Sequence, residues 1–371
     1  MGSVPSPMRP LSRSRRVAAA PSQPPPSDHR IYASFCNDTT SNWVEYYDPS
    51  SNGFTHVGSI PGLGPNCVLK DFAMVSLGES IYFIGGRVVR KERPTARLED
   101  GLDDEEFVEV DLEVRSTVLR YDVGRDMWAQ CGPLSQPRCC FACTVCDGRI
   151  YVAGGRFDVA GTHGVSSGEV YDPVCDEWNP LPDMSVLRYK CAGVTWQGKI
   201  YVIGGFASRG GDRHNNGKVT ESFILERSSA EVYDTRTGKW HVVVGMWQLD
   251  VPPNQIVAVN ETLFSSGDCL KPWKGHIESY DGDMNMWNVM DKSHLRTCNP
   301  LTQRVYLTMA PIGSRLYFLG GYRTAAEPSL IRSKVYMFDT SVASCEWMSL
   351  EPSEEEQKKE LCSHCCVVRI S

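Results

Sequence analysis

The apolar residues of this chain fall into short runs separated by compact polar turns. The pattern is clearest near residue 200, where the small and apolar run "CAGVTW" is followed by a turn at Gly198 and by the β-branched and aromatic run "IYVIGG". Two further runs, "AEVYDT" and "KWHVVV", flank a turn at Thr237-Gly238. Runs of this length and composition, bounded by glycine turns, are typical of β-strands. The pattern therefore predicts a unit of four short strands.

The same unit recurs at intervals of roughly fifty residues, the period of a repeat array. Its most regular mark is an aromatic-Asp pair followed, six residues after the acid, by a large aromatic residue. Five copies keep this spacing: Tyr47-Asp48 with Phe54, Tyr121-Asp122 with Trp128, Tyr171-Asp172 with Trp178, Tyr233-Asp234 with Trp240, and Tyr280-Asp281 with Trp287. A sixth copy, Phe338-Asp339 with Trp347, is two residues longer.

A strand that ends in two glycines precedes the aromatic-Asp mark. Complete copies end at Gly86, Gly155, Gly205 and Gly321, while "LFSSGD" at 263–268 is a degraded copy and "IYASF" from Ile31 a shortened one. Glycine lacks Cβ, so its backbone can adopt a positive φ or lie close against a neighbouring chain. We expect the Tyr and Trp side chains to seal one sheet against the next. We expect the Asp to hydrogen-bond the backbone of its turn.

Six such sheets predict a closed radial array, because one sheet alone cannot bury both faces and a ring leaves only short, protected edges. The chain ends indicate how the ring closes. The amino-terminal part supplies three strands, "IYASF", "WVEYYDP" and "GFTHVG", without a first strand. The carboxyl-terminal part supplies "SHCCVVRI", a first strand with nothing after it. We predict that these ends complete one shared sheet.

These motifs resemble the kelch repeat, and the resemblance covers residues 30–371. It implies a six-bladed β-propeller closed by N- and C-terminal strands that share one blade. The chain is similar to the kelch part of plant F-box/kelch proteins. The basic stretch before the repeats differs from them, because it lacks the Leu- and Pro-rich helical pattern of an F-box and any BTB-like helical pattern.

Composition narrows the classes of partner. The chain has 371 residues, 41% hydrophobic and 22% charged, which is typical of a globular protein with a sizeable core. Its formal net charge of −7 disfavours a nucleic-acid partner. No apolar run approaches the roughly twenty residues that span a bilayer. Fifteen cysteines without a secretory signal favour reduced thiols in the cytoplasm or nucleus. We expect a monomer that binds protein partners.

Residues 1–29 form a segment of their own. Up to Ser27 it contains four arginines, many prolines and serines, and no acid. Such a segment cannot bury enough apolar surface to offset its ordering entropy, so we expect a disordered basic tail before the 30–371 propeller. Three uses stay open: a plain solvated tail, a transit peptide to a plastid, and a basic nuclear signal in "RPLSRSRR".

Candidate binding residues gather where the long connections are expected. Long loops follow Gly86 and Gly205, and the first contains nine acids between Glu99 and Glu113, a solvated loop or a steering element for a basic partner. Three arginines lie sixteen residues before the first glycine of their unit, which places them at the start of innermost strands: Arg138, Arg188 and Arg304. The resemblance implies that they hold an acidic peptide segment at the channel mouth. The alternative is a structural contact between blades.

Four further residues are expected on that face. Arg87 and Arg156 follow their double glycines directly, and Tyr189 and Tyr306 lie close to the rim. Arginine offers forked donors to carboxylates and aromatic residues often anchor partners, so all four are candidate partner-binding residues. For the two tyrosines, packing between sheets is the alternative.

Metal and enzyme chemistry are disfavoured. "CCFACTVC" at 139–146 contains Cys-x-x-Cys twice, but on a strand Cys140 and Cys143 would point to opposite faces. The iron-binding pattern of the related nitrile-specifier proteins has as its nearest match Glu356, Glu360 and His364, with Glu in place of Asp. Copper oxidases of this architecture need paired histidines, and the eight histidines here are scattered. We expect no metal, no cofactor and no catalysis.

The sequence thus predicts a protein–protein interaction module, a substrate-recognition or adaptor subunit associated with ubiquitin ligases. The ligase link rests on the resemblance alone. Two alternatives stay open: a scaffold or regulatory protein unrelated to ubiquitination, and a metal-dependent kelch enzyme of small-molecule metabolism.

Overall fold

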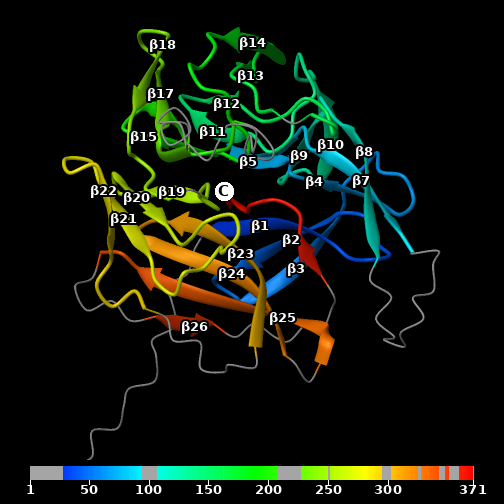
Figure 1. Ribbon diagram of the computed structural model, residues 1–371. Coiled ribbons are helices and arrows are strands. Elements are labelled where there is room, and N and C mark those ends of the chain that lie inside the picture. The colour runs from blue at the N-terminus through cyan, green and yellow to red at the C-terminus, as the bar shows by residue number, and fades with distance from the viewer. Residues whose placement is uncertain are drawn as a thin grey trace, which may run out of the picture.

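The computed structural model describes residues 28–93, 107–161, 163–207, 227–249, 251–294, 302–324, 327–341, 347–350 and 359–370. These residues form an all-β fold of repeated four-stranded antiparallel sheets (Figure 1). No helix in these ranges is long and apolar enough to cross a membrane.

Five sheets repeat the predicted four-strand unit, and we number them along the chain. The first contains β5 (Ala73–Leu77), β6 (Ser80–Ile84), β9 (Val118–Asp122) and β10 (Met127–Cys131). The second contains β11 (Ala142–Cys146), β12 (Arg149–Ala153), β13 (Gly168–Asp172) and β14 (Glu177–Leu181). The third contains β15 (Ala192–Trp196), β16 (Lys199–Ile203), β17 (Ala230–Asp234) and β18 (Lys239–Val243).

The remaining two repeat sheets follow the same order. The fourth contains β19 (Ile256–Val259), β20 (Thr262–Ser265), β21 (Glu278–Asp281) and β22 (Met286–Val289). The fifth contains β23 (Thr302–Ile312), β24 (Arg315–Thr324), β25 (Glu327–Asp339) and β26 (Met348–Leu350).

A terminal sheet joins the two ends of the chain. It contains β1 (His29–Cys36), β2 (Trp43–Asp48), β3 (Gly53–Ser59), β27 (Glu360–Leu361) and β28 (Cys366–Arg369). β28 pairs antiparallel with β1, with Ile31 opposite Val367 and Tyr32 opposite Cys366. The pairing of "IYASF" with the last strand was predicted from the sequence and is found. β1 begins at His29, one residue before the predicted boundary.

The innermost strands follow one another around a central cavity. β5 lies beside β11, β11 beside β15, β15 beside β19, β19 beside β23, β23 beside β28, and β28 beside β5. Figure 1 looks onto this arrangement, with the sheets spread around the middle of the molecule. The cavity has a volume of about 480 Å³ and is lined by residues from the five repeat sheets and the terminal sheet.

In the second to fifth sheets, the tryptophan of the repeated aromatic-Asp mark bonds to the sheet before it. In the second sheet Tyr171 packs against Trp178 with ring centroids 5.0 Å apart, and its hydroxyl donates to Asp176 at 2.6 Å. The Trp178 indole donates to the carbonyl of Gly132, which follows the last strand of the first sheet. Asp172 accepts a hydrogen bond from the backbone of Val174, as predicted for the turn. The six-residue spacing thus places one side chain in the turn and one across the sheet boundary.

The double glycine is required by close contact between neighbouring sheets. Gly155 has φ 94° and its amide donates to the carbonyl of Arg188 in the next repeat at 2.7 Å. A Cβ on Gly155 would lie 2.6 Å from the carbonyl oxygen of Cys139, and one on Gly154 would lie 2.7 Å from that of Arg188. Side chains would therefore force the sheets apart.

The first long connection is more structured than the sequence predicted. It contributes β7 (Arg87–Glu92) and β8 (Val108–Val114), which form a three-stranded accessory sheet with β4 (Cys67–Lys70) in the order β4-β7-β8. The sequence was interpreted as one continuous acidic loop here, although residues 108–114, "VEVDLEV", alternate apolar and acidic side chains as a half-exposed strand does. The high content of acids outweighed that alternation in the prediction. Residues 94–106 of this connection, and 208–226 of the second long one, lie outside the described residues.

Candidate binding face

Arg138 is buried inside the second sheet. It is 1% exposed, and its Nη1 donates to the carbonyls of Gly154 and Ser167 at 2.6 and 3.0 Å. Its Nη2 lies 3.0 Å from Glu169 Oε1. Burial acts to lower the pKa of Arg138, and the Glu169 carboxylate opposes that effect. The guanidinium thus satisfies backbone carbonyls at the end of β12 and the start of β13.

Arg188 repeats the arrangement in the third sheet. It is fully buried and donates to the carbonyls of Gly204 and Ser229 at 2.7 and 3.1 Å, with Glu231 3.8 Å from its Nε. Its carbonyl accepts the amide of Gly155, so the residue also joins two sheets. For Arg138 and Arg188 the geometry agrees with the structural alternative. Neither side chain reaches an exposed rim.

A lysine occupies the equivalent place in the terminal sheet. Lys359 is fully buried, its Nζ lies 2.8 Å from Glu45 Oε2, and it sits 4.5 Å from the centre of the Phe35 ring. Glu45 stands two residues before Tyr47, as Glu169 stands before Tyr171. This offset was the signal in the sequence that could have identified the pair, and it was missed because the basic partner is a lysine from the other end of the chain.

Arg304 departs from its two predicted counterparts. In the second sheet Glu169 stands opposite Val152, and at the equivalent position of the fifth sheet Tyr336 stands opposite Phe318. Arg304 therefore lacks the carboxylate partner that this position supplies to Arg138. Arg304 is half-buried and donates to the hydroxyl of Tyr322 at 3.1 Å. Its guanidinium also lies 5.6 Å from the centre of the Trp273 ring. Of the three recurring arginines, it is the one near the surface.

The other four predicted site residues are half-buried or buried. Arg87 forms ion pairs with Asp71 and Asp111. Arg156 is buried, with its guanidinium 5.3 Å from the centre of the Tyr189 ring. Tyr189 and Tyr306 are also buried, and the Tyr306 hydroxyl lies 3.2 Å from Ser333 Oγ. The two tyrosines therefore pack within the fold.

Of the predicted site residues Tyr306 lines the central cavity, and residues that were not predicted line it as well. Asp71, Cys140 and Lys190 stand just before three successive innermost strands, each with a φ of 55°. Their backbones are joined, because the Cys140 amide donates to the carbonyl of Asp71 at 3.0 Å and the Lys190 amide to that of Cys140 at 2.7 Å. The fold thus presents an acid, a thiol and an amine at one repeated position. Nearby connections carry the exposed side chains Leu187 and Leu270.

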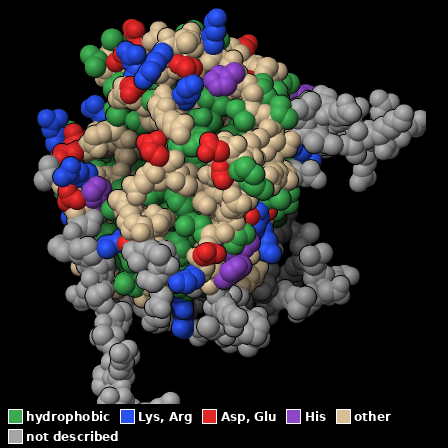
Figure 2. Space-filling model, turned by 90° about the vertical axis from the view of Figure 1, so that its left-hand side faces the viewer, with side chains coloured by type: hydrophobic (Ala, Val, Ile, Leu, Met, Phe, Trp, Pro, Cys, Tyr) green, Lys and Arg blue, Asp and Glu red, His purple; other side chains and the backbone are tan. Residues whose placement is uncertain are grey.

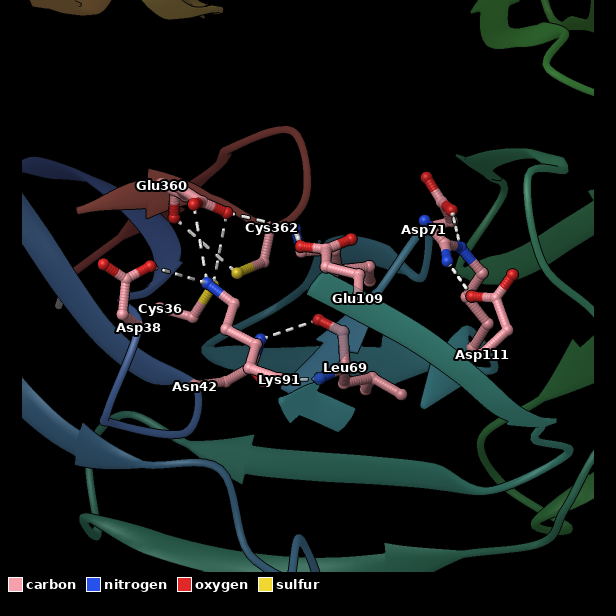
Figure 3. Close-up of polar contacts among 12 residues, drawn as sticks. Cys36, Asp38, Asn42, Leu69, Asp71, Lys91, Glu109, Asp111, Glu360 and Cys362 are labelled. Carbon is pink, nitrogen blue, oxygen red and sulfur yellow. Dashed lines mark hydrogen bonds and ion pairs between the residues drawn. The ribbon is translucent and has the colours of Figure 1, made fainter. Parts of the chain in front are cut away.

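Charge is distributed unevenly around the mouth. An acidic cluster lies where the accessory sheet meets the terminal sheet, and Figure 3 shows Lys91 directed toward Glu360 and Asp38 there, at 3.4 and 3.8 Å. Burial acts to raise the pKa of Glu360, but Lys70 and Lys91 together hold it below the ordinary value. On the side of the fourth and fifth sheets, the exposed cations include Lys271 and Arg323.

Cysteines line much of the cavity, but the described residues contain no group of three or more Cys, His, Asp or Glu able to hold a metal ion. The prediction that Cys140 and Cys143 point apart on one strand was wrong. β11 begins only at Ala142, and both cysteines line the cavity because Cys140 has a left-handed backbone. Of the considered iron pattern, Glu360 pairs with Lys70 and Lys91, His364 faces the cavity, and Glu356 lies outside the described residues.

Comparison with known proteins identifies the repeat. Residues 137–185 match the Kelch motif family. The chain is 34% identical over 180 residues to an F-box/kelch-repeat protein of Arabidopsis thaliana, covering 47% of this chain and 41% of the relative. It is 30% identical over 260 residues to F-box/kelch-repeat protein OR23 of the same plant, covering 61% and 52%. Kelch-like protein 36 of Mus musculus is 25% identical over 209 residues, covering 53% and 26%.

The chain thus spans about half or less of the length of these relatives. Among solved structures, that of YjhT superposes with a TM-score of 0.56 at 14% identity, covering 88% of this chain and all of the other. At that identity the likeness concerns the fold alone. Sequence and fold together make this a kelch-repeat protein.

Proposed function

We propose that this kelch-repeat protein is a protein-interaction module that serves as a substrate-recognition or adaptor subunit of ubiquitin ligase complexes. The observation that carries the proposal is the match to F-box/kelch-repeat and kelch-like proteins, combined with a cavity mouth that carries exposed charged and apolar side chains. The ligase part of the proposal rests on the similarity to F-box/kelch-repeat proteins alone.

The scaffold of this module is, in our proposal, a six-bladed propeller closed by its two chain ends. The cyclic order of the innermost strands and the β1–β28 pairing support this architecture. A closed ring would fix the mouth residues relative to one another, which lowers the entropy lost when a partner binds.

The binding face we propose is the cavity mouth on the side of the long connections. Lys190 and Arg304 are its central cations, since Arg138 and Arg188 are buried in the fold. Leu187 and Leu270 offer exposed apolar contacts beside them. Cations next to apolar side chains suit an acidic peptide segment that also carries hydrophobic residues. On the flank shown in Figure 2, acidic and basic side chains are interspersed.

Affinity capture followed by mass spectrometry tests both parts of the proposal. The wild-type chain should recover cullin-complex subunits and one or more further proteins from a cell extract. Lys190→Glu combined with Arg304→Glu should lose the further proteins, while Lys239→Glu on the outer strand β18 should retain them. Further proteins recovered without any cullin-complex subunit would contradict the ligase role and favour a scaffold. Equal capture by the double variant and by the Lys239→Glu control would show that the binding face is not the cavity mouth.

Localisation follows from the same proposal. A ligase subunit with many reduced thiols would act in the cytoplasm or nucleus, where disulfides are rare. Imaging of the full chain, with and without residues 1–27, tests this. Plastid import that depends on residues 1–27 would contradict it.

A further inference from the structure

β8 is an exposed strand at the edge of the accessory sheet. It pairs with β7 on one side, and within the described residues it has no strand on its other side. The opposite edge of the same sheet is covered, because the Asn42 side chain accepts from the amide of Leu69 at 2.6 Å and donates to its carbonyl at 2.8 Å. Figure 1 shows β8 on the outer flank of the molecule. One edge of this sheet is therefore closed by a side chain and the other is open.

The side chains of β8 combine exposed apolar and acidic groups. Val108 is 51% exposed and Leu112 39%, although both belong to residue types that proteins usually bury. Glu109, Asp111 and Glu113 alternate with them and contact Lys70, Arg87 and Arg115. The Glu113 side chain remains 57% exposed despite its contact. The strand thus presents backbone donors and acceptors, apolar area and partly exposed carboxylates together.

An open strand edge is a template for another strand, and proteins protect such edges with charges and bulges. β8 has both features, since its pairing with β7 shifts register between Val88 and Val89 and it carries three acids. A second copy of β8 would bring like charges side by side, which disfavours self-association. The same acids favour an incoming strand with basic residues. The charge of β8 therefore favours a basic strand over a second copy of β8.

We propose that β8 is a docking edge for an extended segment of another protein in which apolar residues alternate with lysine or arginine. The segment adds a strand to the accessory sheet, its backbone pairs with the free edge of β8, and its cations lie beside Glu109, Asp111 and Glu113. The inference rests on the proposed role as an interaction module, but the residues that carry it differ from Lys190 and Arg304 at the cavity mouth. One experiment can therefore fail without the other.

The probe is a synthetic seven-residue peptide that alternates valine and lysine, titrated into the full-length chain and followed by fluorescence anisotropy. We expect saturable binding, about tenfold weaker for Glu113→Lys because a cation would then face a cation. The matched control is Glu177→Lys on β14, another exposed edge strand, which contains Pro180 and should bind as the wild type does. A peptide that alternates valine and glutamate should not bind.

A third peptide separates strand pairing from simple charge attraction. It keeps the valine–lysine sequence but has N-methylated backbone amides, so it cannot form the ladder. Equal binding of the methylated and unmodified peptides, or equal binding by Glu113→Lys and the wild type, would overturn the proposal.

Two other occupants are outcomes of the same titration. Binding that appears only after residues 1–27 are removed would make the basic tail the occupant and overturn the proposal. If sedimentation shows that the chain self-associates and the peptide binds only after dilution, the occupant of β8 is a second copy of the chain. That result would also overturn the proposal. Loss of cullin-complex capture with intact peptide binding would affect the ligase role alone.

Discussion

Lys359 Nζ lies 2.8 Å from Glu45 Oε2, and this buried ion pair joins residues that are 314 positions apart in the chain. It occupies the place that Arg138–Glu169 and Arg188–Glu231 occupy in the second and third sheets. The terminal sheet is therefore held by more than backbone pairing between β1 and β28. A charged contact specific to the native arrangement also connects its two halves.

Lys359→Met should destabilise the protein strongly, by about 3–5 kcal/mol, because it leaves the Glu45 carboxylate buried without its partner. The measurement is chemical denaturation of the full chain. Lys199→Met, which removes the partly exposed contact with Asp234, is the control and should cost less than about 1 kcal/mol. A Lys359→Met protein as stable as this control would contradict a role for the pair in holding the chain ends.

Arg188→Met and Arg304→Met should differ sharply in stability. Arg188 satisfies two backbone carbonyls and faces Glu231 in the interior, so its loss should cost about 3–5 kcal/mol. Arg304 is half-buried without a facing carboxylate and should cost about 1 kcal/mol or less. Thermal unfolding of the two variants checks this. Similar melting temperatures would mean that their equal spacing in the sequence reflects equal roles.

Stability should fall as the pH drops below the ordinary range of a glutamate, in part through Glu360. Burial alone would raise the pKa of Glu360, but Lys70 and Lys91 lower it in the folded protein. A depressed folded-state pKa stabilises the protein above the unfolded-state pKa, and this contribution is lost as the pH falls through the folded-state value. The measurement is the denaturation midpoint as a function of pH between about pH 6 and about pH 3, the range in which carboxylates titrate. Glu360→Gln should flatten this part of the curve, and an unchanged slope would contradict the assignment.

The cysteines of the cavity should react slowly with alkylating reagents. Burial raises the pKa of Cys191 to about 11 and that of Cys365 to about 12, so little thiolate is present near neutral pH. Among the cysteines in the described ranges, Cys175 is the exposed one and should be labelled before those of the cavity. Time-resolved labelling with iodoacetamide and peptide mass spectrometry gives the order. Labelling of Cys365 as fast as Cys175 would show that the cavity opens readily to solvent.

The repeat and its strands were readable from the sequence because their causes are local. The hydrogen bonds of Tyr171 and Asp172 and the packing of Tyr171 against Trp178 depend on fixed spacings within one hairpin or one turn. Only the bond from Trp178 to Gly132 reaches the sheet before. The pairing of the two chain ends was also predictable, since each end lacked what the other supplied. Identical offsets could not distinguish the buried Arg188 from the half-buried Arg304, because the difference arises from a residue on another strand.

The sequence by itself thus determined the four-strand repeat, its period, and which chain ends meet, since hydrogen-bonded turns and apolar alternation are encoded by near neighbours. Only the tertiary structure decided which arginines are buried, that Lys359 faces Glu45, and that part of an acidic loop is the exposed edge strand β8. Those outcomes depend on residues far apart in the chain, and burial of a charge is decided by whether a partner is present in space.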